Sequence, residues 1–239
     1  MARVIDAGPT GKIGNLIFYN MYGKKYVRTM PSRVKQTKAT KARATEFGKA
    51  STIGAMIRSG LNPVIPDASD RKMQIRLVGV VFQWLNRLTD IKSIPGFQPS
   101  DLSMFSFKEK GQSVRGRWKI NLNVGNPSPG LVEISIPAFT PMKAFEAPPK
   151  SVSVVCKIAT VSIDVKSGMM LGKSNTEMHF ILDGESIAAQ KISQPLPTPQ
   201  SCLIVTGMRL VFMNSKFANA DPNSNKAYMP AEIVEAIYV

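Results

Sequence analysis

The spacing of apolar residues predicts a β-hairpin followed by a helix in the first quarter of the chain. Residues 12–29 are rich in aromatic and β-branched side chains on both sides of a turn at Tyr22-Gly23, which is typical of a hairpin. From Lys38 to Gly60 the apolar residues recur at steps of three and four, which indicates an amphipathic helix. Thr37 or Thr40 could cap this helix.

A second helical pattern follows a proline-rich break. The apolar residues again step by three and four: Met73, Leu77, Val80 or Val81, Trp84 or Leu85, and Leu88. The run at residues 78–82 would also suit a strand, but the length of the pattern and its flanking charges favour a helix. We expect the two helices to form an antiparallel pair.

After residue 98 the pattern changes to short alternating runs separated by Gly, Pro, Asn and Ser. The expected strands are residues 102–107, 114–124, 131–136, 152–165, 176–182, 186–192 and 202–213. An apolar tail, Glu232 to Val239, could add a strand to the edge of a neighbouring molecule. Pairing with the chain's own sheet is the default expectation.

These elements predict an α+β protein with two domains. An N-terminal β-hairpin and helix pair, residues 1–98, would precede a mainly antiparallel β-sandwich, residues 99–239. An isolated hairpin is only marginally stable in water, so this one needs a partner, which could belong to another subunit. The candidate assembly residues are Ile13, Leu16, Phe18, Tyr19, Tyr26, Ile233, Ile237 and Tyr238.

The charge is unevenly distributed along the chain. The formal net charge is +15, and the first 60 residues carry twelve Lys and Arg against two acids, hence +10 of that excess. Such asymmetry suggests a polyanionic partner, although a solvated surface that keeps the protein soluble is the commoner explanation. The candidate anion-binding residues are Lys24, Lys25, Arg28, Arg33, Lys35, Lys38, Lys41 and Arg43.

The sequence contains no catalytic or metal-binding signature. His179 is the only histidine and lies in an alternating run, so we interpret it as a residue at the surface of a strand. The turn around Gly11-Lys12 resembles a P-loop only superficially, because Asp6 stands where a glycine is required and Ile13 replaces the magnesium-binding Ser or Thr. We therefore expect neither an enzyme nor a cofactor.

The two cysteines and the first residues of the sequence indicate in which cellular compartment the protein is made. Cys156 and Cys202 lie in apolar runs typical of strands, so we expect reduced thiols in the core. The first nine residues lack the apolar run of a secretory signal, and no stretch reaches the roughly 20 apolar residues of a membrane helix. This predicts a protein that is cytoplasmic at synthesis.

Three short motifs resemble those of an uncharacterised family of Bacteroidota proteins. They are the Gly-Pro-x-Gly-Lys-x-Gly segment at residues 8–14, the Ile-Pro-Ala-Phe-Thr-Pro run at 136–141 and the Ala-Pro-Pro run at 147–149. The resemblance implies a similar fold with a β-rich C-terminal half. It implies no activity and no functional residues.

Two functions are consistent with these patterns. The leading hypothesis is a structural subunit that binds copies of itself and forms a tube, filament or shell through its hairpin and basic helix. The alternative is a nucleic-acid-binding protein, possibly of coat type, whose basic arm contacts phosphates. A small-molecule-binding β-sandwich is a third reading, and only the expected fold favours it.

Overall fold

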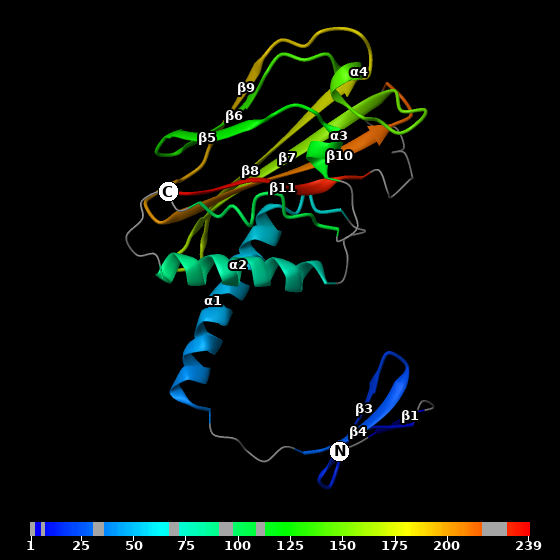
Figure 1. The fold of residues 1–239 in the computed structure, drawn as a ribbon, viewed down its shortest axis with the longest axis vertical. Coiled ribbons are helices and arrows are strands. Elements are labelled where there is room, and N and C mark those ends of the chain that lie inside the picture. The colour runs from blue at the N-terminus through cyan, green and yellow to red at the C-terminus, as the bar shows by residue number, and fades with distance from the viewer. Residues whose placement is uncertain are drawn as a thin grey trace. The chain divides into compact units, whose positions relative to one another are not determined.

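The chain forms two compact units, Met1–Ala44 and Thr45–Val239. We call them the N-terminal unit and the body. The computed structural model describes residues 3–5, 8–30, 36–66, 72–90, 98–108, 113–216 and 229–239. Within these ranges it contains helices and three antiparallel sheets (Figure 1), which confirms a mixed α+β protein with a β-rich half.

The N-terminal unit contains one antiparallel sheet with the strand order β1-β2-β3-β4. The strands are β1 (Arg3–Ile5), β2 (Gly8–Ile13), β3 (Leu16–Met21) and β4 (Lys24–Thr29). The predicted hairpin is present as β3 and β4. Its predicted start at Lys12 is wrong, because Gly14 turns the chain with φ +57° and so places Lys12 and Ile13 in β2. That left-handed conformation is strained for residues with a side chain.

Two long helices lie where the sequence predicts them. They are α1 (Lys38–Gly60) and α2 (Met73–Asp90). The backbone N–H of Thr40 donates to Thr37 Oγ1 at 3.1 Å, so Thr37 caps α1. Residues 38–49 of α1 are exposed, and burial begins at Ala50.

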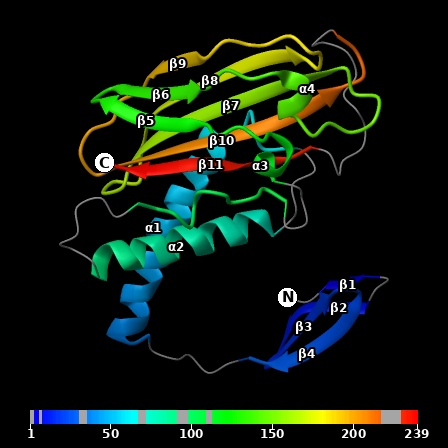
Figure 2. The same ribbon diagram turned by 45° about the horizontal axis from the view of Figure 1, so that its top comes forward.

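The predicted antiparallel helix pair is wrong. Figures 1 and 2 show α1 crossing α2. A Cβ atom at Gly54 would lie 3.1 Å from Val78 Cγ2, so the absence of a side chain at Gly54 allows the close approach. Each helix buries its apolar side against the same sheet as well as against the other helix. Packing on this shared sheet determines how the two helices cross.

The body contains two antiparallel sheets. The main sheet has the order β11-β10-β7-β8, and the second sheet has the order β5-β6-β9. Their strands are β5 (Asn123–Ser128), β6 (Leu131–Ile136), β7 (Ser153–Asp164), β8 (Met170–Ile181), β9 (Gln190–Pro195), β10 (Cys202–Met213) and β11 (Ala231–Tyr238). Two short helices, α3 (Val114–Arg117) and α4 (Pro141–Ala144), complete the body.

The main sheet is buried on both faces (Figures 1 and 2). Along β7, Ala159, Val161 and Ile163 pack in a core with α1 and α2, whereas Cys156 and Ile158 pack in a second core with the three-stranded sheet. Helices thus cover one face and the second sheet covers the other. The β-rich half is confirmed, but the predicted β-sandwich is not.

Two of the expected strands are wrong. Residues 102–104 form a turn, and the segment that follows meets β11 at an isolated bridge between Ser106 and Glu232 and through a few backbone hydrogen bonds. Residues 114–117 form α3, and β5 begins only at Asn123. The alternation of residues 118–124 nevertheless has a physical basis, because Trp118, Ile120, Leu122 and Val124 all pack in or against the second core.

The division into units differs from the one expected at residue 98. Residues 45–60 of α1 belong to the body, and α2 shares a core with the main sheet. A helix that buries its apolar side against a sheet belongs to the folding unit of that sheet.

Candidate functional site

One face of the N-terminal sheet carries a group of apolar side chains beside Lys25. Ile13 pairs with Leu16, and Phe18 pairs with Val27. Residues directly opposite each other in a sheet share a face, and so do alternate residues along a strand. We call the surface formed by Ile13, Leu16, Phe18 and Val27 the apolar face.

The opposite face combines cations with tyrosines. Tyr19 and Tyr26 pair directly, and their rings stack with centroids 5.5 Å apart and an interplanar angle of 18°. The Arg28 guanidinium lies 5.8 Å from the centre of the Tyr19 ring, within the range of a cation–π interaction. The pairing registers place Lys12 and Lys24 on this side too. We call the surface formed by Lys12, Tyr19, Lys24, Tyr26 and Arg28 the basic face.

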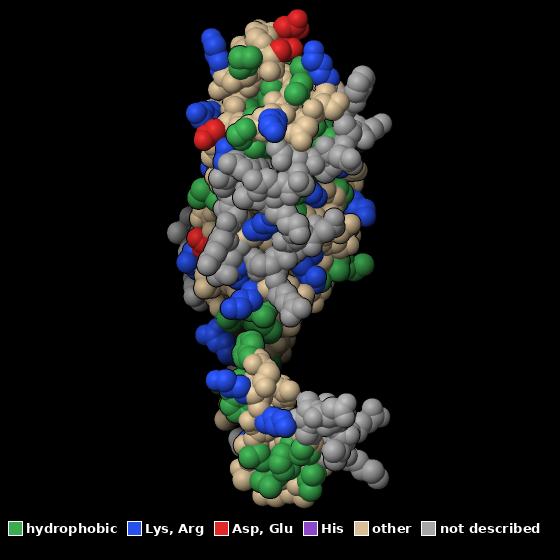
Figure 3. Space-filling view, turned by 90° about the vertical axis from the view of Figure 1, so that its right-hand side faces the viewer, with side chains coloured by type: hydrophobic (Ala, Val, Ile, Leu, Met, Phe, Trp, Pro, Cys, Tyr) green, Lys and Arg blue, Asp and Glu red, His purple; other side chains and the backbone are tan. Residues whose placement is uncertain are grey.

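None of the side chains described between residues 9 and 30 is buried. Ile13 is 51% exposed, Leu16 40% and Val27 55%. Figure 3 shows hydrophobic side chains gathered at the surface of the N-terminal unit, with lysine and arginine beside them. Because each large aliphatic side chain gains roughly 1.5–3 kcal/mol on full burial, an exposed group of them favours a partner.

The structure separates the candidate anion-binding residues. Lys24 and Arg28 lie on the basic face, whereas Lys25 pairs with Asn20 and lies on the other side of the sheet. Lys38, Lys41 and Arg43 occupy the exposed start of α1, whose first turn contains no acid. Positive charge there opposes the helix dipole, which makes a nearby anion favourable. Arg33 and Lys35 lie outside the described residues.

The candidate assembly residues divide in the same way. Ile13, Leu16 and Phe18 lie on the apolar face, whereas Tyr19 and Tyr26 lie on the basic face. These five residues therefore do not share one face. Val27 and Lys12 belong to the two faces but were not among the candidates, because the side chains that meet across strands depend on the register that the turns at Gly14 and Tyr22-Gly23 set.

The three C-terminal candidate assembly residues make contacts within the body. Ile233 is fully buried, and β11 pairs with β10, which confirms the default expectation for the tail. Ile237 packs against the second core. The Tyr238 ring lies edge-on to Trp84, with centroids 5.6 Å apart. These three side chains therefore already make contacts within the chain's own body.

The described residues contain no cluster of three His, Cys, Asp or Glu side chains that could hold a metal ion. His179 lies exposed on β8, as expected for a strand surface. Cys156 and Cys202 are both free and buried, as expected. Cys156 pairs with Leu210 of β10, and Cys202 lies eight residues from Leu210 along the same strand. At 3.3 Å per residue, roughly 26 Å separates the two cysteines. That distance excludes a disulfide between them.

Glu232 is a buried carboxyl group that the sequence analysis overlooked. It is 1% exposed, and its Oε1 accepts a hydrogen bond from the backbone N–H of Arg115 at 3.2 Å. Burial raises the pKa of Glu232, and the hydrogen bonds from the Arg115 and Val114 backbone oppose that shift. The burial of Glu232 has no local sequence signal, because the backbone N–H that binds its carboxyl group is 117 residues away in the chain.

Two comparisons with known proteins found no match. It matches no protein-family model, and no curated protein is significantly similar to it. The resemblance of its short motifs to a Bacteroidota family therefore stays a prediction. Within the described ranges, neither α1 nor α2 is apolar enough over its length to span a membrane.

Proposed function

We propose that this protein is a structural subunit that assembles with copies of itself through its N-terminal unit. One observation carries the proposal: the N-terminal sheet buries none of its described side chains between residues 9 and 30, although Ile13, Leu16, Phe18 and Val27 form an apolar face. The exposed first half of α1 continues the same unburied region of the chain. A second copy supplies the missing apolar surface.

The size of the sheet indicates what kind of assembly to expect. One strand of three residues and three strands of six, about 4.8 Å apart, give a face of roughly 330 Å². A stable interface buries about 800 Å² on each partner, so one such contact is weak alone. A particle with many copies gains its stability from the number of contacts.

The test is to place a negative charge on the apolar face. We expect the wild-type chain to sediment as large regular particles and to show tubes, filaments or shells by electron microscopy. Val27→Glu should abolish these particles, because the carboxylate would be desolvated at the contact. Its melting temperature should change by less than about 2 °C, because Val27 is 55% exposed.

Met21→Glu is the matched control. Met21 is 46% exposed on the same sheet, and its register places it on the opposite side from Val27. It should leave the particles intact. A wild-type chain that stays monomeric at high concentration, or equal loss of particles in both variants, would contradict the proposal.

The basic face favours a second function, the binding of single-stranded nucleic acid. Tyr19 and Tyr26 are partly exposed, so their rings are accessible for stacking with bases, while Lys12, Lys24 and Arg28 beside them suit phosphates. Three such contacts predict a slope of about −2 for log affinity against log salt concentration.

Fluorescence anisotropy with a labelled oligothymidine measures this binding. Tyr19→Ser should weaken it by about 1–3 kcal/mol, because a stacking surface is lost. Lys25→Gln is the control, since Lys25 lies on the other side of the sheet from Arg28. Equal weakening by Lys25→Gln and Arg28→Gln would indicate general attraction to a basic chain rather than a binding face.

A further inference from the structure

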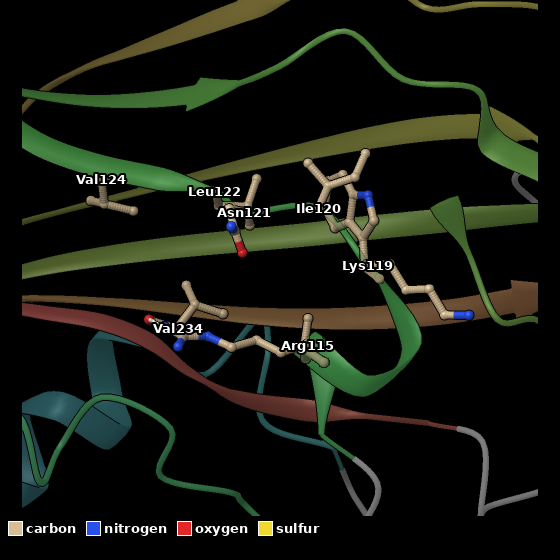
Figure 4. Close-up of a pocket in the computed structure, with 9 residues that line it drawn as sticks. Arg115, Lys119, Ile120, Asn121, Leu122, Val124 and Val234 are labelled. Carbon is tan, nitrogen blue, oxygen red and sulfur yellow. Dashed lines mark hydrogen bonds between the residues drawn. The ribbon is translucent and has the colours of Figure 1, made fainter. Parts of the chain in front are cut away.

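The body contains a cavity that the proposed assembly does not use. It lies between β11 and residues 118–124, the segment that leads into β5, and it has a volume of about 350 Å³. Figure 4 shows its labelled side chains entering from both sides, with Val234 and Arg115 below and Asn121, Leu122 and Ile120 above.

An aromatic cluster around Trp118 fixes the start of residues 118–124, the segment that forms one wall of the cavity. The Trp118 ring stacks on Phe145 with centroids 5.0 Å apart and also contacts Phe139 and Phe180. The backbone N–H of Lys119 donates to the carbonyl of Ala144 at 2.9 Å. The wall is therefore anchored to the core immediately before it reaches the cavity.

Four apolar side chains line part of the cavity, beside its polar groups. Ile120, Leu122, Val124 and Val234 line it, and all four pack in or against the second core. An apolar group of a ligand would meet preformed hydrocarbon here, as in most small-molecule sites.

The polar groups of the cavity favour a negatively charged ligand. Arg115 lines it and donates one hydrogen bond to the Val234 carbonyl at 2.9 Å, which fixes the side chain and leaves other guanidinium N–H groups for a ligand. The Asn121 amide points into the same space from the opposite wall (Figure 4). Among the described residues, no Asp or Glu lines the cavity.

A buried donor adds a second, independent observation. Trp118 also lines the cavity and is 2% exposed, and its indole N–H has no hydrogen-bond acceptor. A buried donor without an acceptor is costly, and a ligand oxygen would relieve that cost.

We propose that this cavity binds a small carboxylate with a compact apolar body, such as a medium-chain or aryl-alkyl acid. Its carboxylate would accept hydrogen bonds from Arg115 and Asn121, and its hydrocarbon would lie against Leu122 and Val124. At about 30 Å³ for each water-sized group, the volume holds roughly ten to twelve non-hydrogen atoms. Octanoate is of this size.

Equilibrium dialysis of the full-length chain with labelled octanoate tests the proposal, with 1-octanol as the uncharged counterpart. We expect saturable octanoate binding below about 1 mM. Arg115→Gln should weaken octanoate binding at least about tenfold, because a charged hydrogen bond is lost, and octanol binding less than about twofold. Leu122→Asp should weaken the binding of both.

Lys143→Gln is the matched control, because it removes one positive charge from an exposed position of the body. Lys143 does not line the cavity, so octanoate binding should stay within about twofold of wild type. Three results would overturn the proposal: no saturation up to about 10 mM, equal losses in Lys143→Gln and Arg115→Gln, or an equal loss of octanol binding in Arg115→Gln.

This test is independent of assembly. The cavity belongs to the body and the apolar face to the N-terminal unit. Val27→Glu should therefore bind octanoate as wild type does, whether or not the chain forms particles.

Discussion

The N-terminal unit and the body differ in how far they bury the faces of their sheets. Both contain antiparallel sheets with β-branched and aromatic side chains. In the body, helices and a second sheet bury both faces of the main sheet. In the N-terminal sheet, no side chain described between residues 9 and 30 is buried. Strand pairing therefore produced sheets in both regions, but only the sheets of the body have a core.

This difference assigns different roles to similar residues. A side chain buried in the body stabilises the fold, whereas an exposed apolar side chain in the N-terminal sheet is free to stabilise a contact. The transition lies within a single helix, because α1 is exposed through Lys49 and buried from Ala50. The comparison therefore predicts that one substitution will have different effects in the two regions.

The largest expected contrast is between two isoleucine truncations. Ile158 is 1% exposed between the main sheet and the second sheet, so Ile158→Ala should reduce the free energy of unfolding by about 2–5 kcal/mol. Ile13→Ala removes the same atoms from a 51% exposed side chain and should cost less than about 0.5 kcal/mol. Urea titration of both variants measures the difference. Similar losses would show that the N-terminal sheet is buried in solution.

An intermediate effect is expected from two glycines of α1. A Cβ atom at Gly60 would lie 2.5 Å from Val161 in β7, so Gly60→Ala should destabilise the body by about 1–3 kcal/mol. Gly48 has no atom within 4 Å of that position, and Gly48→Ala should stabilise the helix by up to about 1 kcal/mol. Thermal unfolding should therefore show shifts of opposite sign. Two shifts of the same sign would contradict the boundary within α1.

The smallest expected effect concerns the buried acid of the body. Since burial raises the pKa of Glu232, the folded state binds this proton more tightly than the unfolded chain does, and stability is lost as the pH rises through the folded pKa. Glu232→Gln should therefore be more stable than wild type at pH 8. The advantage should shrink as the pH falls toward the ordinary glutamate value near 4.5.

Glu185→Gln, at an exposed position, is the control for that measurement. It should show no pH-dependent difference from wild type. If Glu232→Gln is less stable than wild type at every pH, the ionised carboxylate has a favourable role that its burial does not reveal.

The sequence determined the elements whose signals are local. The bounds of α1, β6 and β10 agree with their patterns, because periodicity and flanking breakers act within a few residues. The hairpin turn and the burial of both cysteines could also be predicted. The charge excess in the first 60 residues was evident from composition alone.

Tertiary structure decided which side chains meet. The Tyr22-Gly23 turn pairs Phe18 with Val27, and the Gly14 turn pairs Ile13 with Leu16. A shift of one residue in either pairing would bring different side chains together on each face. The cavity depends on β11 lying beside a segment more than a hundred residues earlier in the chain. Periodicity along a chain shows that one side of an element is apolar, but the partner of that side is determined only when distant segments pack together.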